Sequence, residues 1–164
     1  VKKKVLDEVG LLDESFGMHW EDTDLSWRIR LRGYKILPAC KAKIYHKGSM
    51  TMRKFAKKAK VNWYIKKNRI AGLIKNYGAL NLLKFLPVTF LIYFLIFFKE
   101  LIITRNIKLA FSTILAIFWC LRQLPYILKQ RRIVQGIIRR VPDEQITKFM
   151  QKRPVVLEYL SRAV

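Results

Sequence analysis

The spacing of apolar and polar residues divides the chain into four zones. Residues 1–51 hold short periodic stretches rich in charge, and residues 52–78 form a basic segment with apolar residues at helical spacing. Two long apolar segments occupy residues 79–130, and residues 131–164 are a basic tail. Because Pro142 precedes a periodic stretch, the tail predicts one more short helix. The pattern predicts a small mixed region followed by a mainly helical one.

The first zone predicts two helices and then two strands. The first helix ends at Gly10, a residue suited to the left-handed position after a helix. A loop leads to a second helix, which Asp22 or Thr23 caps and which runs to Arg32. Aromatic and β-branched residues at 34–38 and 42–46 predict short strands. Since about 50 residues cannot bury a core of their own, this order indicates one edge of an α/β domain.

The second and third zones point towards a membrane. Residues 52–77 read as a basic amphipathic helix, which suits an anionic membrane surface. The apolar segments at about 80–103 and 109–128 contain uncharged runs shorter than the ~20 residues that a spanning helix needs. With snorkelling lysines at their ends, both can span, and the flanking positive charge favours a hairpin with both ends cytoplasmic. Helices lying in the interface, re-entrant helices and helices packed on a soluble partner are the alternatives.

The charge is unevenly distributed. The formal net charge is +22, seven of the eleven acidic residues fall within the first 24 positions, and residues 25–99 contain none. Such a basic stretch attracts anions, and an acidic lipid surface fits better than nucleic acid, because no nucleic-acid motif is present and apolar segments follow. Cys40 and Cys120 form neither a disulfide pattern nor a zinc pattern, so a cytoplasmic location of this region is expected.

Three carboxylates, Glu21, Asp22 and Asp24, follow Trp20 within four positions. They suit the positive end of a helix dipole, where each acidic residue contributes ~0.3–1 kcal/mol. Asp24 also precedes Arg28 by four residues, which predicts an ion pair. A functional interpretation stands beside this one: a tryptophan often forms the wall of a sugar or base site, and a carboxylate at a helix start can act as a general base.

These elements together resemble a known family. The stretches "LLDESF", "EDTDLSWRIRLRGYKI", a strand ending in "YH" and the later "YIKKNRI" are similar in order and spacing to the C-terminal half of the catalytic domain of inverting family 2 glycosyltransferases. The resemblance implies a GT-A fold, a nucleotide-diphosphate sugar donor, and a polysaccharide or lipid-linked acceptor. It also implies Mg²⁺ or Mn²⁺ as the metal. The enzyme would be of the hexosyl- or rhamnosyltransferase type.

The resemblance also assigns roles to residues. Asp22 becomes the base that deprotonates the acceptor hydroxyl, with Glu21 as its neighbour. Trp20 lines the acceptor site. His46 becomes a metal ligand near the diphosphate, although a lone histidine is more often structural. Asp24 and Arg28 become candidate substrate-binding residues, Arg28 also being suited to fixing its helix.

The family's Asp-x-Asp motif belongs upstream of this region. The chain begins at Val1 without such a motif, so it is expected to be an inactive C-terminal fragment of a longer protein at the cell membrane, with its catalytic part cytoplasmic. The alternative is a small basic membrane-anchored interaction protein without catalysis.

Overall fold

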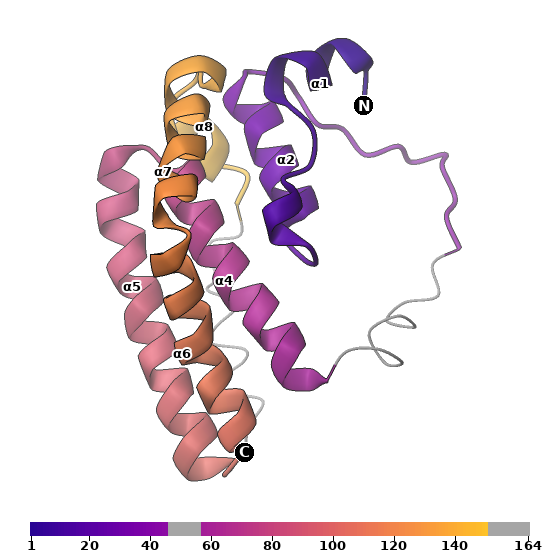
Figure 1. The fold of residues 1–164 in the computed structure, drawn as a ribbon. Helices are drawn as coiled ribbons and strands as arrows, with labels where there is room; N and C mark the ends of the chain where they lie inside the picture. Colours follow the sequence, from indigo (N-terminus) through magenta and orange to yellow (C-terminus); the bar gives the residue numbers. More distant parts are fainter. Residues whose placement is uncertain (46–56, 151–164) are drawn as a thin grey trace.

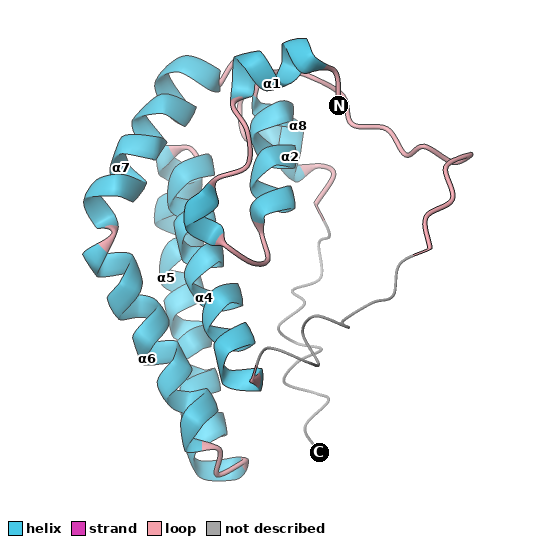
Figure 2. Cartoon of the chain, turned by 45° about the vertical axis from the view of Figure 1, so that its right-hand side comes forward, coloured by secondary structure: helices cyan, strands magenta, loops and turns pink. Residues whose placement is uncertain are grey.

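A computed structural model describes residues 1–45 and 57–150, and every regular element within these ranges is a helix (Figure 2). In order, the elements are α1 (Lys3–Val9), η1 (Glu14–Phe16), α2 (Glu21–Leu31), α4 (Lys58–Asn76), α5 (Ala79–Phe98), η2 (Lys99–Ile103), α6 (Ile107–Arg122), α7 (Leu124–Ile133), η3 (Val134–Ile138) and α8 (Glu144–Thr147).

The predicted α/β class, with part of a GT-A domain, is therefore wrong for the described residues. Residues 34–45 form no strand: they leave α2 as an extended loop (Figure 2). Most apolar side chains of this loop are exposed, Tyr45 by 97 %. A strand exists only when a neighbouring strand accepts and donates its backbone hydrogen bonds, and the described chain supplies no such neighbour. Composition alone made this segment resemble a strand.

The first two predicted helices are present, but α2 starts differently. Gly10 ends α1 with a φ of 79°, as predicted. The N-cap of α2 is Trp20, in the left-handed region, and no side chain caps the helix. The prediction that Asp22 or Thr23 is the cap is thus wrong, because both already lie inside the first turn.

The C-terminal zone is a layer of long helices. Figure 1 shows α5 and α6 side by side and antiparallel, with η2 at their tip and α4 running alongside. The helix Ala79–Ile103, made of α5 and η2, has 25 residues and a mean hydropathy of 2.1, which is long and apolar enough to cross a membrane. The second apolar segment is bent by 64° between α6 and α7. Length and composition of this kind are weak evidence for a span, because core helices of soluble proteins share them.

Two apolar clusters hold the layers together. One joins α1, α2, α4, η3 and α8 through Trp27, Leu31 and Leu73, among others. The other joins η1 to α4, α5, α6 and α7 through Phe16, Ile70 and further buried side chains. Helix α4 contributes to both clusters, so it connects the N-terminal helices to the apolar pair α5–α6 and fixes the position of the acidic segment.

Candidate active site at the start of α2

The acidic segment begins at an unusual backbone turn. Gly17, His19 and Trp20 have φ values of 65°, 62° and 72°. Glycine tolerates such angles, whereas each non-glycine residue held in this region costs of the order of 1–3 kcal/mol. Glu21 and Asp22 follow immediately. The surrounding structure must therefore hold this turn in place.

Asn68 on α4 holds the turn through its side-chain amide. The Nδ2 atom donates to the backbone oxygens of Phe16 (3.0 Å), Met18 (2.7 Å) and His19 (2.7 Å). Asn68 is fully buried. If the loop moved away, the buried amide and the three backbone oxygens would lose their hydrogen bonds and each would cost its full desolvation penalty. The amide therefore holds the loop in one conformation.

Lys67 supports the same loop from beside Asn68. Its Nζ donates to the backbone oxygen of Ser15 (2.9 Å) and to Oδ1 of Asn68 (2.7 Å). The ammonium group also lies 3.9 Å from the ring centroid of Trp119, an arrangement that stabilises its positive charge. Burial lowers the pKa of Lys67 to about 8. Asn68 and Lys67 belong to the stretch "YIKKNRI", so two of the stretches that carry the family resemblance are in direct contact.

The two predicted catalytic carboxylates differ in exposure. Asp22 is exposed, and its Oδ1 accepts from the backbone N–H of Thr23 at 2.6 Å. Glu21 is half-buried, and its Oε2 is enclosed without a hydrogen-bond partner among the described residues. Neither carboxylate forms an ion pair with any residue in the described ranges. Asp22 is therefore the carboxylate that a ligand at the positive end of α2 could reach directly.

Asp24 and Arg28 have structural contacts instead. The predicted ion pair is confirmed, with Nε of Arg28 2.9 Å from Oδ2 of Asp24. The other oxygen of Asp24 accepts from Asn76 at 2.9 Å and lies 3.2 Å from Nζ of Lys75. Arg28 also donates to the backbone oxygens of Gly10 and Leu11 at the end of α1. Since Asp24 is fully buried, these contacts position helices.

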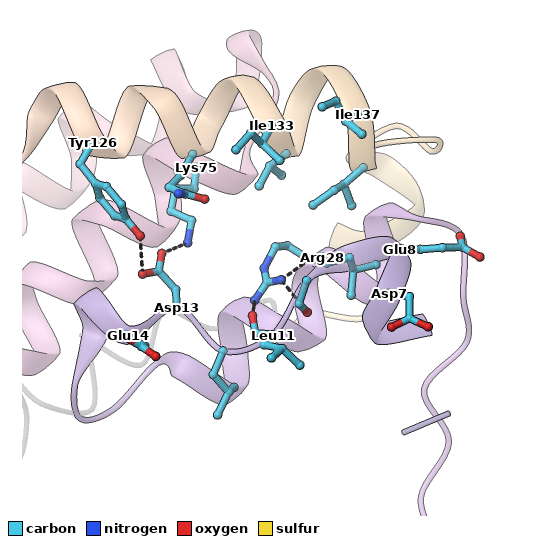
Figure 3. Close-up of a pocket in the computed structure, with 16 residues that line it drawn as sticks. Asp7, Glu8, Leu11, Asp13, Glu14, Arg28, Lys75, Tyr126, Ile133 and Ile137 are labelled. Carbon is cyan, nitrogen blue, oxygen red and sulfur yellow. Dashed lines mark hydrogen bonds and ion pairs between the residues drawn. The ribbon is translucent and has the colours of Figure 1, made fainter. Parts of the chain in front are cut away.

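Lys75 extends this network to a second acidic residue (Figure 3). Its ammonium group also pairs with Asp13, whose Oδ1 accepts from the hydroxyl of Tyr126 at 3.0 Å. Burial alone would raise the pKa of Asp13, but hydrogen bonds from Lys75, Ser15 and Tyr126 hold it below its usual value. Ion pairs of Lys75 thereby join the loop before α2, α2 itself and α4, and the hydrogen bond from Tyr126 adds α7.

A cavity of about 510 Å³ opens beside this network, between the end of α1 and α7 (Figure 3). Of the predicted site residues, only Arg28 lines it. The cavity and the exposed Asp22 are therefore separate features of the described chain.

A metal site does not follow from the described residues. Within residues 1–45 and 57–150, no three His, Cys, Asp or Glu side chains gather closely enough to hold an ion. His46, the predicted ligand, lies outside the described residues. The described residues therefore offer no complete ligand set for Mg²⁺ or Mn²⁺.

The sequence patterns did not single out Asn68, Gly72 or Lys75. A Cβ atom on Gly72 would lie 2.9 Å from two ring carbons of Trp20, so the indole lies directly on the backbone of α4. One signal was available: Gly72 interrupts an otherwise good helix at residues 58–76, and a glycine inside a helix often marks a close contact.

The chain matches no protein-family model, no curated protein and no solved structure.

Proposed function

We propose that this chain carries the acceptor-activating part of a membrane-associated glycosyltransferase. The observation that carries the proposal is the strained turn at His19 and Trp20, which Asn68 holds just before Asp22, an exposed carboxylate that forms no ion pair within residues 1–45 and 57–150. Strained backbone residues that the surrounding structure holds in place cluster at functional sites. The family resemblance of this stretch supplies the reaction class.

The proposed chemistry is an inverting sugar transfer. Asp22 takes the proton from the acceptor hydroxyl, whose oxygen then bonds to the anomeric carbon of the donor sugar. The bond from that carbon to the nucleoside diphosphate breaks, and the diphosphate leaves with the bonding electrons. Trp20 and Glu21 directly precede Asp22 and would contact the acceptor. The donor and any metal would be held by groups that the described residues do not supply.

Asp24 and Arg28 act in this proposal as positioning residues. Asp22 lies in the first turn of α2. The buried ion pair and the contacts of Arg28 with α1 hold this turn in place. The acceptor would be a glycan or lipid-linked molecule at the cytoplasmic face of the cell membrane, because the turn rests on the same helix, α4, that packs against the apolar pair α5–α6.

The test compares Asp22→Asn with a matched control, Glu14→Gln. The control also replaces an exposed carboxylate by its amide, but at a position outside the site. Membranes that contain the longest natural form of the protein are supplied with labelled uridine- or thymidine-diphosphate sugars and a polyprenyl-linked acceptor. We expect Asp22→Asn to lose transfer by about 10²-fold or more while it keeps its fold. Transfer at the wild-type rate by Asp22→Asn would refute the assignment of the base.

A second candidate function is a basic membrane anchor without catalysis. Exposed apolar side chains on α5 and α6 favour it, since they fit a lipid or protein surface whether or not sugar is transferred. The same assay separates the two candidates: an anchor shows no transfer in the wild type with any donor, yet remains bound to membranes.

A further inference from the structure

Helices α5 and α6 share an apolar face that no other described element covers. On α5 and η2 it includes Leu91, Leu95 and Ile102, exposed by 58, 49 and 64 %. On α6 it includes Phe111, Phe118 and Leu121, exposed by 51, 62 and 64 %. These residues recur every three to four positions or at multiples of that spacing, so each helix presents one continuous stripe.

On their other sides the two helices meet α4, through apolar side chains such as Ile70 over part of its length and through polar side chains near the tip. Glu100 in η2 accepts from Asn62 at 3.1 Å and from Lys66 at 3.3 Å. Asn62 also donates to Ser112 on α6 at 3.3 Å, and Lys66 donates to Thr113. These hydrogen bonds and this ion pair connect the N-terminal half of α4 to η2 and α6, near the tip of the pair α5–α6. The three helices α4, α5 and α6 therefore form one packed layer, and the apolar stripe lies outside the contacts between α4 and the pair.

The position of α4 is hard to reconcile with a hairpin that stands upright in a bilayer. Helix α4 ends beside the start of α5 and runs back along the pair for 19 residues, or about 28 Å, against about 37 Å for the 25 residues of α5 and η2 (Figure 1). Lys57, Lys58 and Lys60 at its start are exposed. In an upright hairpin this charged end would lie within the hydrocarbon, where lysines are strongly disfavoured.

The charges around the apolar face are basic. Between residues 79 and 138 the sequence has one acidic residue, Glu100, and it is buried. Lys84, Arg105, Lys108 and Arg122 are exposed on the same helices or at their tip. Anionic headgroups complement such an edge, while acyl chains complement the stripe.

We propose that α5 and α6 lie sideways in one leaflet of an anionic bilayer, with the stripe among the acyl chains. The tip at Thr104 then stays on the same side of the membrane as α1 and α2, and α4 lies at headgroup level with Lys57, Lys58 and Lys60 in water. This inference stands on the helical layer alone and does not depend on sugar transfer.

Topology tests the proposal first. In a chain with Cys40→Ser and Cys120→Ala, single cysteines replace Lys2, Lys58 or Thr104, and a membrane-impermeant maleimide is added to one side of sealed native membranes. We expect all three positions to react from the same side. Reaction of Thr104→Cys from the side opposite to Lys2→Cys would overturn the proposal in favour of a spanning hairpin.

Depth provides the second test, with nitroxide labels on cysteines at Leu83, Leu91 and Ile102. Helices lying sideways place the three labels at one shallow depth, whereas an upright helix places Leu91 far deeper than the other two. A label at Leu11, which is exposed but lies outside the stripe, should remain in water. Unequal depths with Leu91 at the bilayer centre would refute the sideways arrangement.

Vesicle binding tests the chosen partner. We expect binding to phosphatidylcholine vesicles only when phosphatidylglycerol is included, and weaker binding at high salt. Leu91→Lys together with Phe118→Lys should weaken binding by about tenfold or more at unchanged helix content. The control Leu11→Lys should bind as the wild type does. Equal binding to neutral vesicles, or no binding to either kind, would overturn the proposal.

Discussion

The indole of Trp20 lies on the backbone of Gly72: a Cβ atom at that position would be 2.9 Å from Cε3 and Cζ3 of the ring. A separation below 3.0 Å leaves no room for a methyl group unless the ring moves. The ring of Trp20 therefore packs directly on the backbone of α4 at Gly72, although 52 positions separate the two residues in the sequence. The orientation of the acidic segment depends on this contact.

Gly72→Ala should consequently destabilise the protein and displace Trp20. Overpacking of this kind typically costs about 1–3 kcal/mol, of which the better helix propensity of alanine offsets up to about 1 kcal/mol. The free energy of unfolding and tryptophan fluorescence measure the two effects. Gly136→Ala is the matched control, because a Cβ atom there meets nothing within 4 Å. Equal stability of both variants would mean that the Trp20–Gly72 contact is not tight in solution.

Lys75→Met should be among the most damaging single substitutions in α4. Lys75 is 2 % exposed and pairs with both Asp13 and Asp24, so its loss leaves two buried carboxylates without their shared cation. Removing one partner of a buried ion pair costs about 3–5 kcal/mol. Chemical denaturation measures this loss, and Lys84→Met, at an exposed position, should change stability by no more than about 0.5 kcal/mol. A loss at Lys75 as small as that of the control would contradict the network.

The sequence was informative where structure depends on near neighbours. The end of α1 at Gly10 and the pairing of Asp24 with Arg28 each depend on contacts within one or two helical turns, and both are confirmed. The long apolar segments are helical, as their composition indicated, although the second is bent between α6 and α7.

Contacts between distant segments could not be predicted in this way. Lys75 reads as one more solvated lysine of a basic helix, because its partner Asp13 lies 62 positions earlier. The same limit explains why the two strands predicted at residues 34–38 and 42–46 are wrong for the described residues 34–45. Alternating apolar and polar residues and β-branched residues indicate that a segment could form a strand. Whether it does depends on a neighbouring strand, and the sequence of the segment alone does not show whether such a neighbour exists. Asn68 shows no sign of its role until the turn that it holds is seen.

The stability should depend on acid through Asp13. Its pKa in the folded state lies below the unfolded value of 3.8, so in that range the unfolded chain binds more protons than the folded one. Stability from this group is present above about pH 4 and is lost as the pH falls through the folded pKa. Unfolding free energies measured from pH 6 downwards should fall more steeply in the wild type than in Asp13→Asn. Parallel pH profiles of the two proteins would show that Asp13 is not stabilised in this way.

Asn68→Ala should affect sugar transfer more than its effect on folding explains. The substitution removes the donor shared by the backbone oxygens of Phe16, Met18 and His19, so the left-handed turn before Asp22 can relax. A misplacement of about 1 Å at a catalytic group can cost about 10²-fold in rate, so we expect kcat to fall by that order while the KM of the donor changes little.

Asn62→Ala is the control for this prediction, since Asn62 lies on the same helix and is hydrogen-bonded to Glu100 and Ser112 at the opposite end from the turn. Both variants lose buried hydrogen bonds, at about 1–3 kcal/mol for each group left without a partner, and both should unfold more easily. Rates are therefore compared per folded molecule, with the folded fraction taken from denaturation curves. An equal fall in kcat for both variants would mean that Asn68 acts only through stability. Retention of kcat by Asn68→Ala would show that the strained turn is not needed to position Asp22.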